Sequence, residues 1–230
     1  MRKLIQTLFT QNTRNNINKK HPTGAFCVKI NFMIKVILFD ADGVLINGIR
    51  FSTALERDYG ISIERTLPFF NGPFQDCLVN SSDLKDTIAP YLSEWGWNDG
   101  VDAFLDYWFK VEHTINEELI SYIQDLRSQG FVCCVATNNE KYRFQYMLDE
   151  MGFKNSFDKI YASANLGHVK PNLEFYKKLL DDLGSVSKDE VLFWDDSPEN
   201  ITSAREFGIN AELYSTFSDF KRRIKIYPQF

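Results

Sequence analysis

Short apolar runs alternate with longer amphipathic stretches along most of the chain. Residues 34–39 form an apolar run that only Lys35 interrupts, and its brevity and branched side chains are typical of a buried parallel strand. Similar runs follow at 131–136, 158–162, 191–194 and 211–214. Helical patterns separate these runs. We therefore predict an α/β fold in which a parallel sheet carries helices on both faces.

The residues at the ends of the helical patterns support this alternation. Asn116 is a good helix cap, and Pro171 and Pro198 each suit the first turn of a helix. Beyond residue 115 the predicted helices cover 117–129, 140–151, 171–183, 198–207 and 217–224.

Residues 48–113 break the alternation. Thr53-Ala54-Leu55-Glu56 fits a capping box, which would open a short helix that Gly60 ends. Pro90 is expected to kink or shorten a later helix. Apolar positions at helical spacing form two stripes: Leu84, Ile88, Leu92 and Trp95, then Val101, Phe104, Leu105, Trp108 and Val111. We predict a small helical module with its own aromatic core. Most of its aromatic side chains should fill that core, and fewer should line a pocket: Phe69, Phe70, Phe74, Trp95, Trp97 and Trp108.

Charge is distributed unevenly along the chain. The formal net charge is -5, but residues 1–39 contain seven Lys or Arg and no acidic residue, so the remainder carries a net charge of -12. An acidic body argues against nucleic acid as a partner. Residues 1–33 form a basic extension that we expect to be disordered. Its lack of acidic residues resembles a mitochondrial targeting segment, but it contains no Ser and only two Arg, so we expect a cytoplasmic protein.

Two further classes of protein are disfavoured. No run of about 18 apolar residues exists, so we expect no membrane span. Cys133 and Cys134 are adjacent in an apolar run and should point to opposite faces of a strand. The cysteines are expected to be buried thiols, not a disulfide framework or a zinc site.

Polar residues follow the predicted strands at their carboxyl ends, where doubly wound sheets bind ligands. The first strand ends in Asp40 and Asp42, the second in Thr137 and Asn138, and the fourth in Asp195 and Asp196, while Lys170 lies in the loop after the third. We expect these side chains to converge on one rim of the sheet.

The chemistry of this set points to phosphoryl transfer. Crowded carboxylates repel one another unless a cation joins them, and hard oxygen ligands suit Mg²⁺. A hydroxyl and an ammonium group are what a phosphoryl group needs for binding. Asp40 is predicted to attack phosphorus and form an aspartyl-phosphate. Asp42 is predicted to protonate the leaving oxygen and then to activate the water that breaks this intermediate.

Four motifs, in this order, resemble those of the haloacid dehalogenase-like (HAD) hydrolase superfamily. They are Phe39-Asp40-Ala41-Asp42-Gly43-Val44-Leu45, Thr137-Asn138, Lys170-Pro171 and Trp194-Asp195-Asp196-Ser197-Pro198-Glu199-Asn200-Ile201. The resemblance covers residues 34–230. It implies a Rossmann-like core at 34–47 and 114–230, a small helical (C1) cap at 48–113, Mg²⁺ dependence and phosphatase activity. The last motif is similar to that of sugar-1-phosphate phosphatases and of the N-terminal phosphatase domain of soluble epoxide hydrolases.

The resemblance also implies a role for each residue of the motifs. Asp40 would be the nucleophile and a metal ligand, and Asp42 would be the acid/base and would give a backbone carbonyl to the metal. Asp196 would bind the metal directly, and Asp195 directly or through water. Thr137 and Lys170 would hold the phosphate, and Asn138 is a further candidate for phosphate binding. We expect a small phosphorylated substrate, with a sugar phosphate favoured.

Several alternatives stay open at this stage. A β-phosphoglucomutase-like enzyme has almost the same core motifs, and a non-catalytic protein that binds a phosphorylated ligand is also compatible with them. A dehalogenase is disfavoured, because it would not need Asp42. Asn138 would either line the phosphate pocket or only shape its loop. The specific substrate and the oligomeric state cannot be predicted from the sequence.

Overall fold

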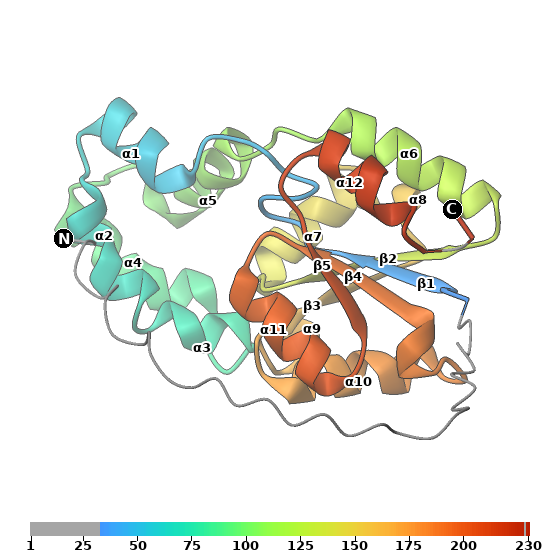
Figure 1. Cartoon of the computed structure of the whole chain (residues 1–230). Helices are drawn as coiled ribbons and strands as arrows, with labels where there is room; N and C mark the ends of the chain where they lie inside the picture. Colours follow the sequence, from blue (N-terminus) through green and yellow to red (C-terminus); the bar gives the residue numbers. More distant parts are fainter. Residues whose placement is uncertain (1–32, 228) are drawn as a thin grey trace, which may run out of the picture. The chain divides into compact units, whose positions relative to one another are not determined.

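The computed structural model describes residues 33–227 and 229–230, so the predictions for residues 1–32 lie outside the described part. Five parallel strands form one sheet in the order β3-β2-β1-β4-β5 (Figure 1). The strands are β1 (Val36–Phe39), β2 (Val132–Thr137), β3 (Lys159–Ala162), β4 (Val191–Asp195) and β5 (Asn210–Leu213). All five predicted strands are confirmed, with ends that shift by one or two residues.

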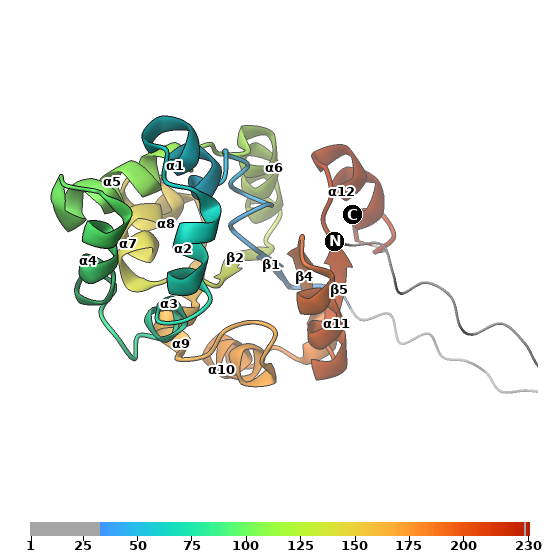
Figure 2. The same cartoon turned by 90° about the vertical axis from the view of Figure 1, so that its left-hand side faces the viewer.

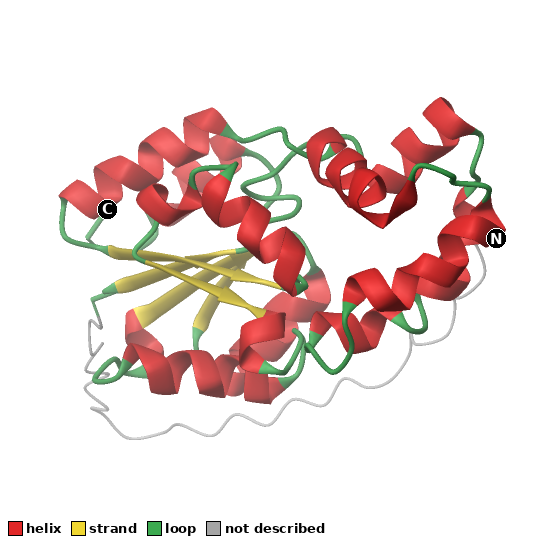
Figure 3. Ribbon diagram, turned by 180° about the vertical axis from the view of Figure 1, so that it is seen from behind, coloured by secondary structure: helices red, strands yellow, loops and turns green. Residues whose placement is uncertain are grey.

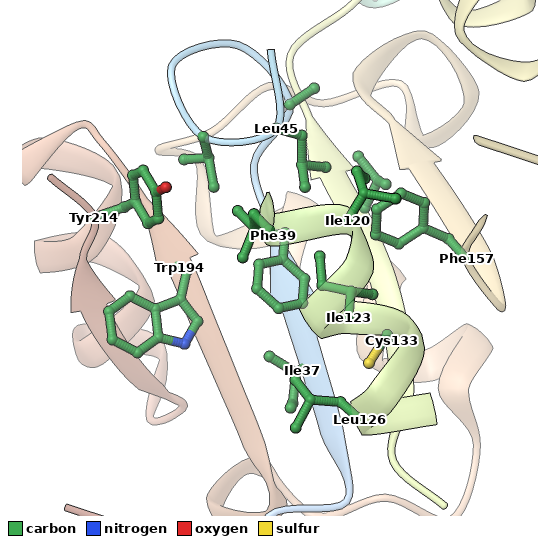
Figure 4. Close-up of a cluster of buried hydrophobic side chains, with 14 of the residues drawn as sticks. Ile37, Phe39, Leu45, Ile120, Ile123, Leu126, Cys133, Phe157, Trp194 and Tyr214 are labelled. Atoms are coloured by element: carbon green, nitrogen blue, oxygen red, sulfur yellow. The ribbon is translucent and has the colours of Figure 1, made fainter. Parts of the chain in front are cut away.

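Both faces of the sheet are buried, and successive side chains alternate between two hydrophobic clusters. Phe39, Cys133 and Trp194 belong to one cluster (Figure 4). Leu38 and Cys134 belong to the other. The two adjacent cysteines therefore point to opposite faces, as predicted, and they are free thiols. This alternation explains why the strands are almost wholly apolar.

Helices cover each face of the sheet (Figures 1 and 3). The first face carries α6 (Glu117–Ser128), α7 (Lys141–Asp149), α8 (Phe153–Ser156) and α12 (Phe217–Ile224). The second carries α9 (Ser163–Leu166), α10 (Leu173–Leu183) and α11 (Pro198–Phe207), and a short 3₁₀ helix, η1 (Lys188–Glu190), precedes β4. Pro198 opens α11 as predicted. Pro171 does not lie in the first turn of α10, because Asn172 is the N-cap and accepts a hydrogen bond from the Glu174 amide at 2.9 Å.

Five helices lie between β1 and α6 in the sequence and have a hydrophobic cluster of their own (Figure 2). They are α1 (Phe51–Tyr59), α2 (Ile63–Phe70), α3 (Phe74–Leu78), α4 (Leu84–Trp95) and α5 (Gly100–Val111). We call residues 48–113 the helical insertion. Among the described residues, no helix combines the length and the apolarity that crossing a membrane requires.

One prediction about the helical insertion is wrong. The predicted capping box does not open α1, because this helix already begins at Phe51, whose amide donates to Glu112 Oε1 at 2.9 Å. A carboxylate from the far end of the insertion thus takes the place of a local cap. Of the two effects expected of Pro90, a kink or a shorter helix, the second is not found, because α4 continues through Pro90 to Trp95.

The two connecting segments that join the helical insertion to the rest of the chain lie side by side. The Asn47 amide donates to the Thr114 carbonyl and the Asn116 amide donates to the Leu45 carbonyl, each at 2.8 Å. Ile46 also bridges to Ile115. The insertion therefore starts and ends at one place, just beyond the carboxyl end of β1.

Candidate active site

The central strands β1 and β4 are neighbours in the sheet, and the chain leaves them toward opposite sides. β1 leads toward β2, whereas β4 leads toward β5 on the other edge. A parallel sheet opens a crevice at such a switch point, outside the carboxyl ends of the strands. Asp40 and Asp42 lie in the loop after β1, Asp195 is the last residue of β4, and Asp196 follows it.

Three carboxylates meet at this point. One oxygen each of Asp40, Asp195 and Asp196 lies within 4.8 Å of the others. The buried Lys170 Nζ joins two of them, at 2.9 Å from Asp40 Oδ1 and 2.6 Å from Asp195 Oδ2. Three negative charges against one positive charge leave an excess of two when all are ionised. A divalent cation would fit this imbalance and this set of oxygen donors.

Burial and charge set the proton affinity of the cluster. Burial raises the pKa of Asp40 to about 8; Lys170 opposes this rise, and Asp195 adds to it. Burial alone would lower the pKa of Lys170, but Asp40 and Asp195 raise it above its ordinary value. Partial burial and the charge of Asp195 raise the pKa of Asp196. The ammonium group of Lys170 is therefore firmly charged, while Asp40 and Asp196 hold a proton more readily than ordinary carboxyl groups do.

The backbone after β1 explains why Asp40 sits where it does. The Asp40 amide continues the ladder to β4 by donating to the Trp194 carbonyl at 2.8 Å, and the Ala41 amide donates to Asp40 Oδ1 at 2.7 Å. The chain then turns at Gly43, whose φ is +87°. A Cβ at this position would lie 2.2 Å from Asp196 Oδ2, so only glycine lets the loop after β1 pass this close to the loop after β4.

The side chain of Asp42 does not join the carboxylate cluster. Its Oδ2 accepts a hydrogen bond from Asn139 Nδ2 at 2.9 Å, and its Oδ1 lies 3.6 Å from Arg143 Nη2. About half of this side chain (49%) is exposed. The same Asn139 amide also donates to Thr137 Oγ1 at 2.8 Å. Asp42 is thus oriented by two neighbours, apart from the other carboxylates, and a metal-binding role would fall to its main-chain carbonyl.

Asn138 has a different set of contacts from the one that phosphate binding would need. Its Oδ1 accepts from the Lys170 amide and its Nδ2 donates to the Lys170 carbonyl, both at 2.8 Å. The side chain thereby fixes the loop that carries Lys170. Contact with a phosphate would be left to the main chain of Asn138.

Four side chains that the sequence reasoning did not single out support the site. Asn200 Nδ2 donates to both oxygens of Asp195, at 3.1 and 3.0 Å. Asn139 orients Asp42, and the buried Arg143 lies between Asp42 and Glu112, whose Oε2 is 3.4 Å away. Asn139 directly follows the Thr137-Asn138 motif and Asn200 belongs to the fourth motif, so the sequence carries a signal for both. Nothing local marks Arg143 or Glu112.

A pocket of about 680 Å³ opens beside Asp42, between the switch point and the helical insertion. Polar residues at its base include Asp42, Asn139, Arg143 and Asp196. Of the six aromatic residues considered above, half line the pocket, namely Phe70, Phe74 and Trp108. Four of the six, Phe69, Trp95, Trp97 and Trp108, are buried in the cluster of the insertion, so Trp108 belongs to the core and also lines the pocket. The expectation that most of them would be core is confirmed.

Lys170 bridges two buried carboxylates at a switch point of the sheet, and a helical insertion follows the first strand. These features together define a class of α/β hydrolytic enzymes. A family model described as haloacid dehalogenase-like hydrolase matches residues 37–213. The chain belongs to this family.

Individual relatives agree with this assignment. Bifunctional epoxide hydrolase 2 of Rattus norvegicus is 30% identical over 201 residues, which cover 76% of this chain but only 35% of that protein. The chain thus spans about a third of the length of this relative. Glyceraldehyde 3-phosphate phosphatase of Methanocaldococcus jannaschii is 25% identical over 194 residues, covering 77% of this chain and 83% of that one. The crystal structure of a HAD family enzyme from Bacteroides thetaiotaomicron, in complex with magnesium and inorganic phosphate, has the same fold, with a TM-score of 0.67 and 20% identity over 81% of this chain and 98% of that chain.

Proposed function

We propose that the protein is a Mg²⁺-dependent phosphatase that hydrolyses a phosphate monoester through an aspartyl-phosphate on Asp40. The observation that carries the proposal is the placement of Asp40. Its carboxylate is buried, bonded to Lys170 and grouped with Asp195 and Asp196, and Asp42 stands beside it at the base of a pocket. The relative that is named a glyceraldehyde 3-phosphate phosphatase supports this class of reaction.

The carboxylates of Asp40 and Asp196 and the main-chain carbonyl of Asp42 would hold Mg²⁺. Both oxygens of Asp195 already accept hydrogen bonds, from the Ser197 amide, from Asn200 and from Lys170, so this residue suits a supporting position better than that of a direct ligand. When bound, Mg²⁺ would lower the repulsion between the Asp40 carboxylate and an anionic phosphate.

The proposed reaction has two chemical steps, and residues of this chain act in both. An Asp40 oxygen attacks phosphorus while the bond from phosphorus to the alcohol oxygen breaks, and the Asp42 carboxyl gives its proton to that leaving oxygen. Asp42, now ionised, takes a proton from water as this water attacks phosphorus. Inorganic phosphate leaves and the Asp40 carboxylate is restored. Lys170 and the Thr137 hydroxyl would neutralise and orient the phosphoryl oxygens.

Asn139 and Arg143 are positioning residues in this scheme. They bind Asp42 from two sides and leave half of it exposed toward the pocket, where a leaving alcohol would lie. Asp40 and Asp42 thereby occupy different surroundings, buried for the nucleophile and half-exposed for the acid.

Phosphate release tests the proposal. The purified protein should release inorganic phosphate from a panel of phosphate monoesters with Mg²⁺, and EDTA or the Asp40→Asn substitution should abolish this release. Asp58→Asn, on the exposed side of α1, is a matched control that should keep it. A rearranged phosphate ester without free phosphate would identify a mutase instead. Binding without turnover would identify a non-catalytic protein and refute the proposal.

A further inference from the structure

The wall of the pocket that the helical insertion provides is mostly apolar. Four aromatic rings, those of Phe51, Phe70, Phe74 and Trp108, face it from α1, α2, α3 and α5. They also pack on one another, for example with Phe51 and Trp108 stacked at 4.8 Å between ring centroids. The wall is therefore a rigid aromatic surface that begins next to Asp42 and leads away from the phosphate-binding end.

The polar groups within this wall are already bonded to the protein. The Thr66 hydroxyl donates to the Ile63 carbonyl at 2.9 Å, and the Trp108 indole donates to Glu112 Oε2 at 3.0 Å. The other oxygen of Glu112 accepts from the Phe51 amide. A sugar would bring several hydroxyl groups to a surface whose hydrogen-bonding groups are occupied, and desolvating those hydroxyls without partners is costly. Further polar side chains line the pocket at Asn47, Arg50 and Ser52.

Two large apolar side chains of the pocket are exposed. Ile49 is 51% exposed and Leu67 is 43% exposed, and both line the pocket. Exposed apolar side chains that adjoin a larger apolar surface mark places where a ligand is bound. The apolar wall therefore continues to the mouth of the pocket instead of closing over a small substrate.

We infer that the substrate is the monophosphate ester of a long, apolar alcohol, with its phosphate at Asp40 and its chain along the aromatic wall. The inference rests on the proposed phosphatase function and replaces the sugar phosphate that the sequence favours. A volume of about 680 Å³ is large enough for a chain of many carbon atoms. Because burying one methylene group is worth about a fourfold change in an equilibrium or rate ratio, kcat/KM should rise with chain length.

A homologous series of substrates tests the inference. We would measure phosphate release from n-butyl, n-octyl and n-dodecyl phosphate, from a branched isoprenyl phosphate, and from glucose 6-phosphate and glycerol 3-phosphate. From butyl to octyl phosphate, which adds four methylene groups, kcat/KM should rise about 250-fold, given about fourfold per methylene. The dodecyl and isoprenyl arms show which kind of chain fits better. Sugar phosphates hydrolysed as fast as octyl phosphate, or activity independent of chain length, would overturn the inference and leave the phosphatase function intact. Release from none of the esters would count against the phosphatase function itself.

A pair of variants tests whether the dependence of kcat/KM on chain length arises from the apolar wall of the pocket. Leu67→Gln places an amide on the apolar wall and should lower the ratio of octyl to butyl kcat/KM by about fivefold, because roughly one to two buried methylene contacts are lost. Leu173→Gln is the control, since Leu173 is similarly exposed (44%) but lies on α10, outside the pocket. It should leave the ratio unchanged. An unchanged ratio in Leu67→Gln, or an equal loss in both variants, would show that the chain does not lie along this wall.

Discussion

Replacing Asp40 by Asn tests the electrostatics of the carboxylate cluster separately from its chemistry. Burial raises the pKa of Asp40 to about 8 from an ordinary value of 3.8. Between these two values the metal-free folded protein keeps a proton that the unfolded chain has released. Because the unfolded state then binds fewer protons, this group makes the free energy of unfolding fall as the pH rises.

The Asp40→Asn variant lacks this titration. Its free energy of unfolding should therefore rise relative to that of the wild type between about pH 4 and about pH 8, by at most about 6 kcal/mol at about 1.36 kcal/mol for each pH unit. Near pH 4 the wild-type carboxyl is neutral, so the pH-dependent difference should vanish.

Urea unfolding of both proteins in EDTA, across this range, measures the difference. A difference that stays constant with pH would refute the assignment of a raised pKa to Asp40. Repeating the series with Mg²⁺ provides an internal check. A bound cation favours the ionised form of Asp40, so the pH dependence should become weaker.

Three further predictions concern individual side chains. Asp83 caps α4 and also accepts a hydrogen bond from Lys141 at 2.5 Å. In thermal unfolding, Asp83→Ala should therefore lower the free energy of unfolding by about 1 kcal/mol more than Asp83→Ser, which retains a capping hydroxyl. Equal losses would contradict the capping role. Arg143→Met should cost about 3 kcal/mol in urea unfolding because it leaves the mostly buried Glu112 carboxylate without its cationic partner, and adding Glu112→Gln should recover part of this loss, whereas additive losses would argue against the pair. Asn200→Leu should raise the Mg²⁺ concentration needed for half-maximal phosphate release about 10- to 100-fold, and an unchanged requirement would exclude a supporting role for its amide.

The elements of the sheet were predictable because their signals are local. The apolar run before Asp40 and the Pro at 198 each determine a strand or a helix start within a few residues, and the structure confirms both. Parallel strands bring their carboxyl ends to one edge, so the meeting of Asp40 with Asp195 also followed from the pattern.

Other features depend on residues that are far apart in the sequence. The start of α1 is set by Glu112, which lies 61 residues from its partner, so the local capping box at 53–56 was misleading. The sequence likewise could not predict which aromatic rings of the helical insertion face the pocket. Phe69 and Phe70 are neighbours in the chain, yet the first is fully buried and the second lines the pocket. Helical spacing identifies an apolar face, but not whether protein or ligand covers it.

The covalent intermediate is the central claim, and it can be observed directly. Asp42→Asn removes the group that takes a proton from the attacking water, so the phosphorylated enzyme should accumulate when the leaving oxygen needs no proton. We would mix this variant with Mg²⁺ and an ester of an acidic alcohol, such as p-nitrophenyl phosphate, quench in acid, and map the peptides by mass spectrometry. The account predicts one phosphoryl group on Asp40, and none in the Asp40→Asn variant. Turnover by the wild type with no phosphoryl group on Asp40, or with one on another residue, would contradict it.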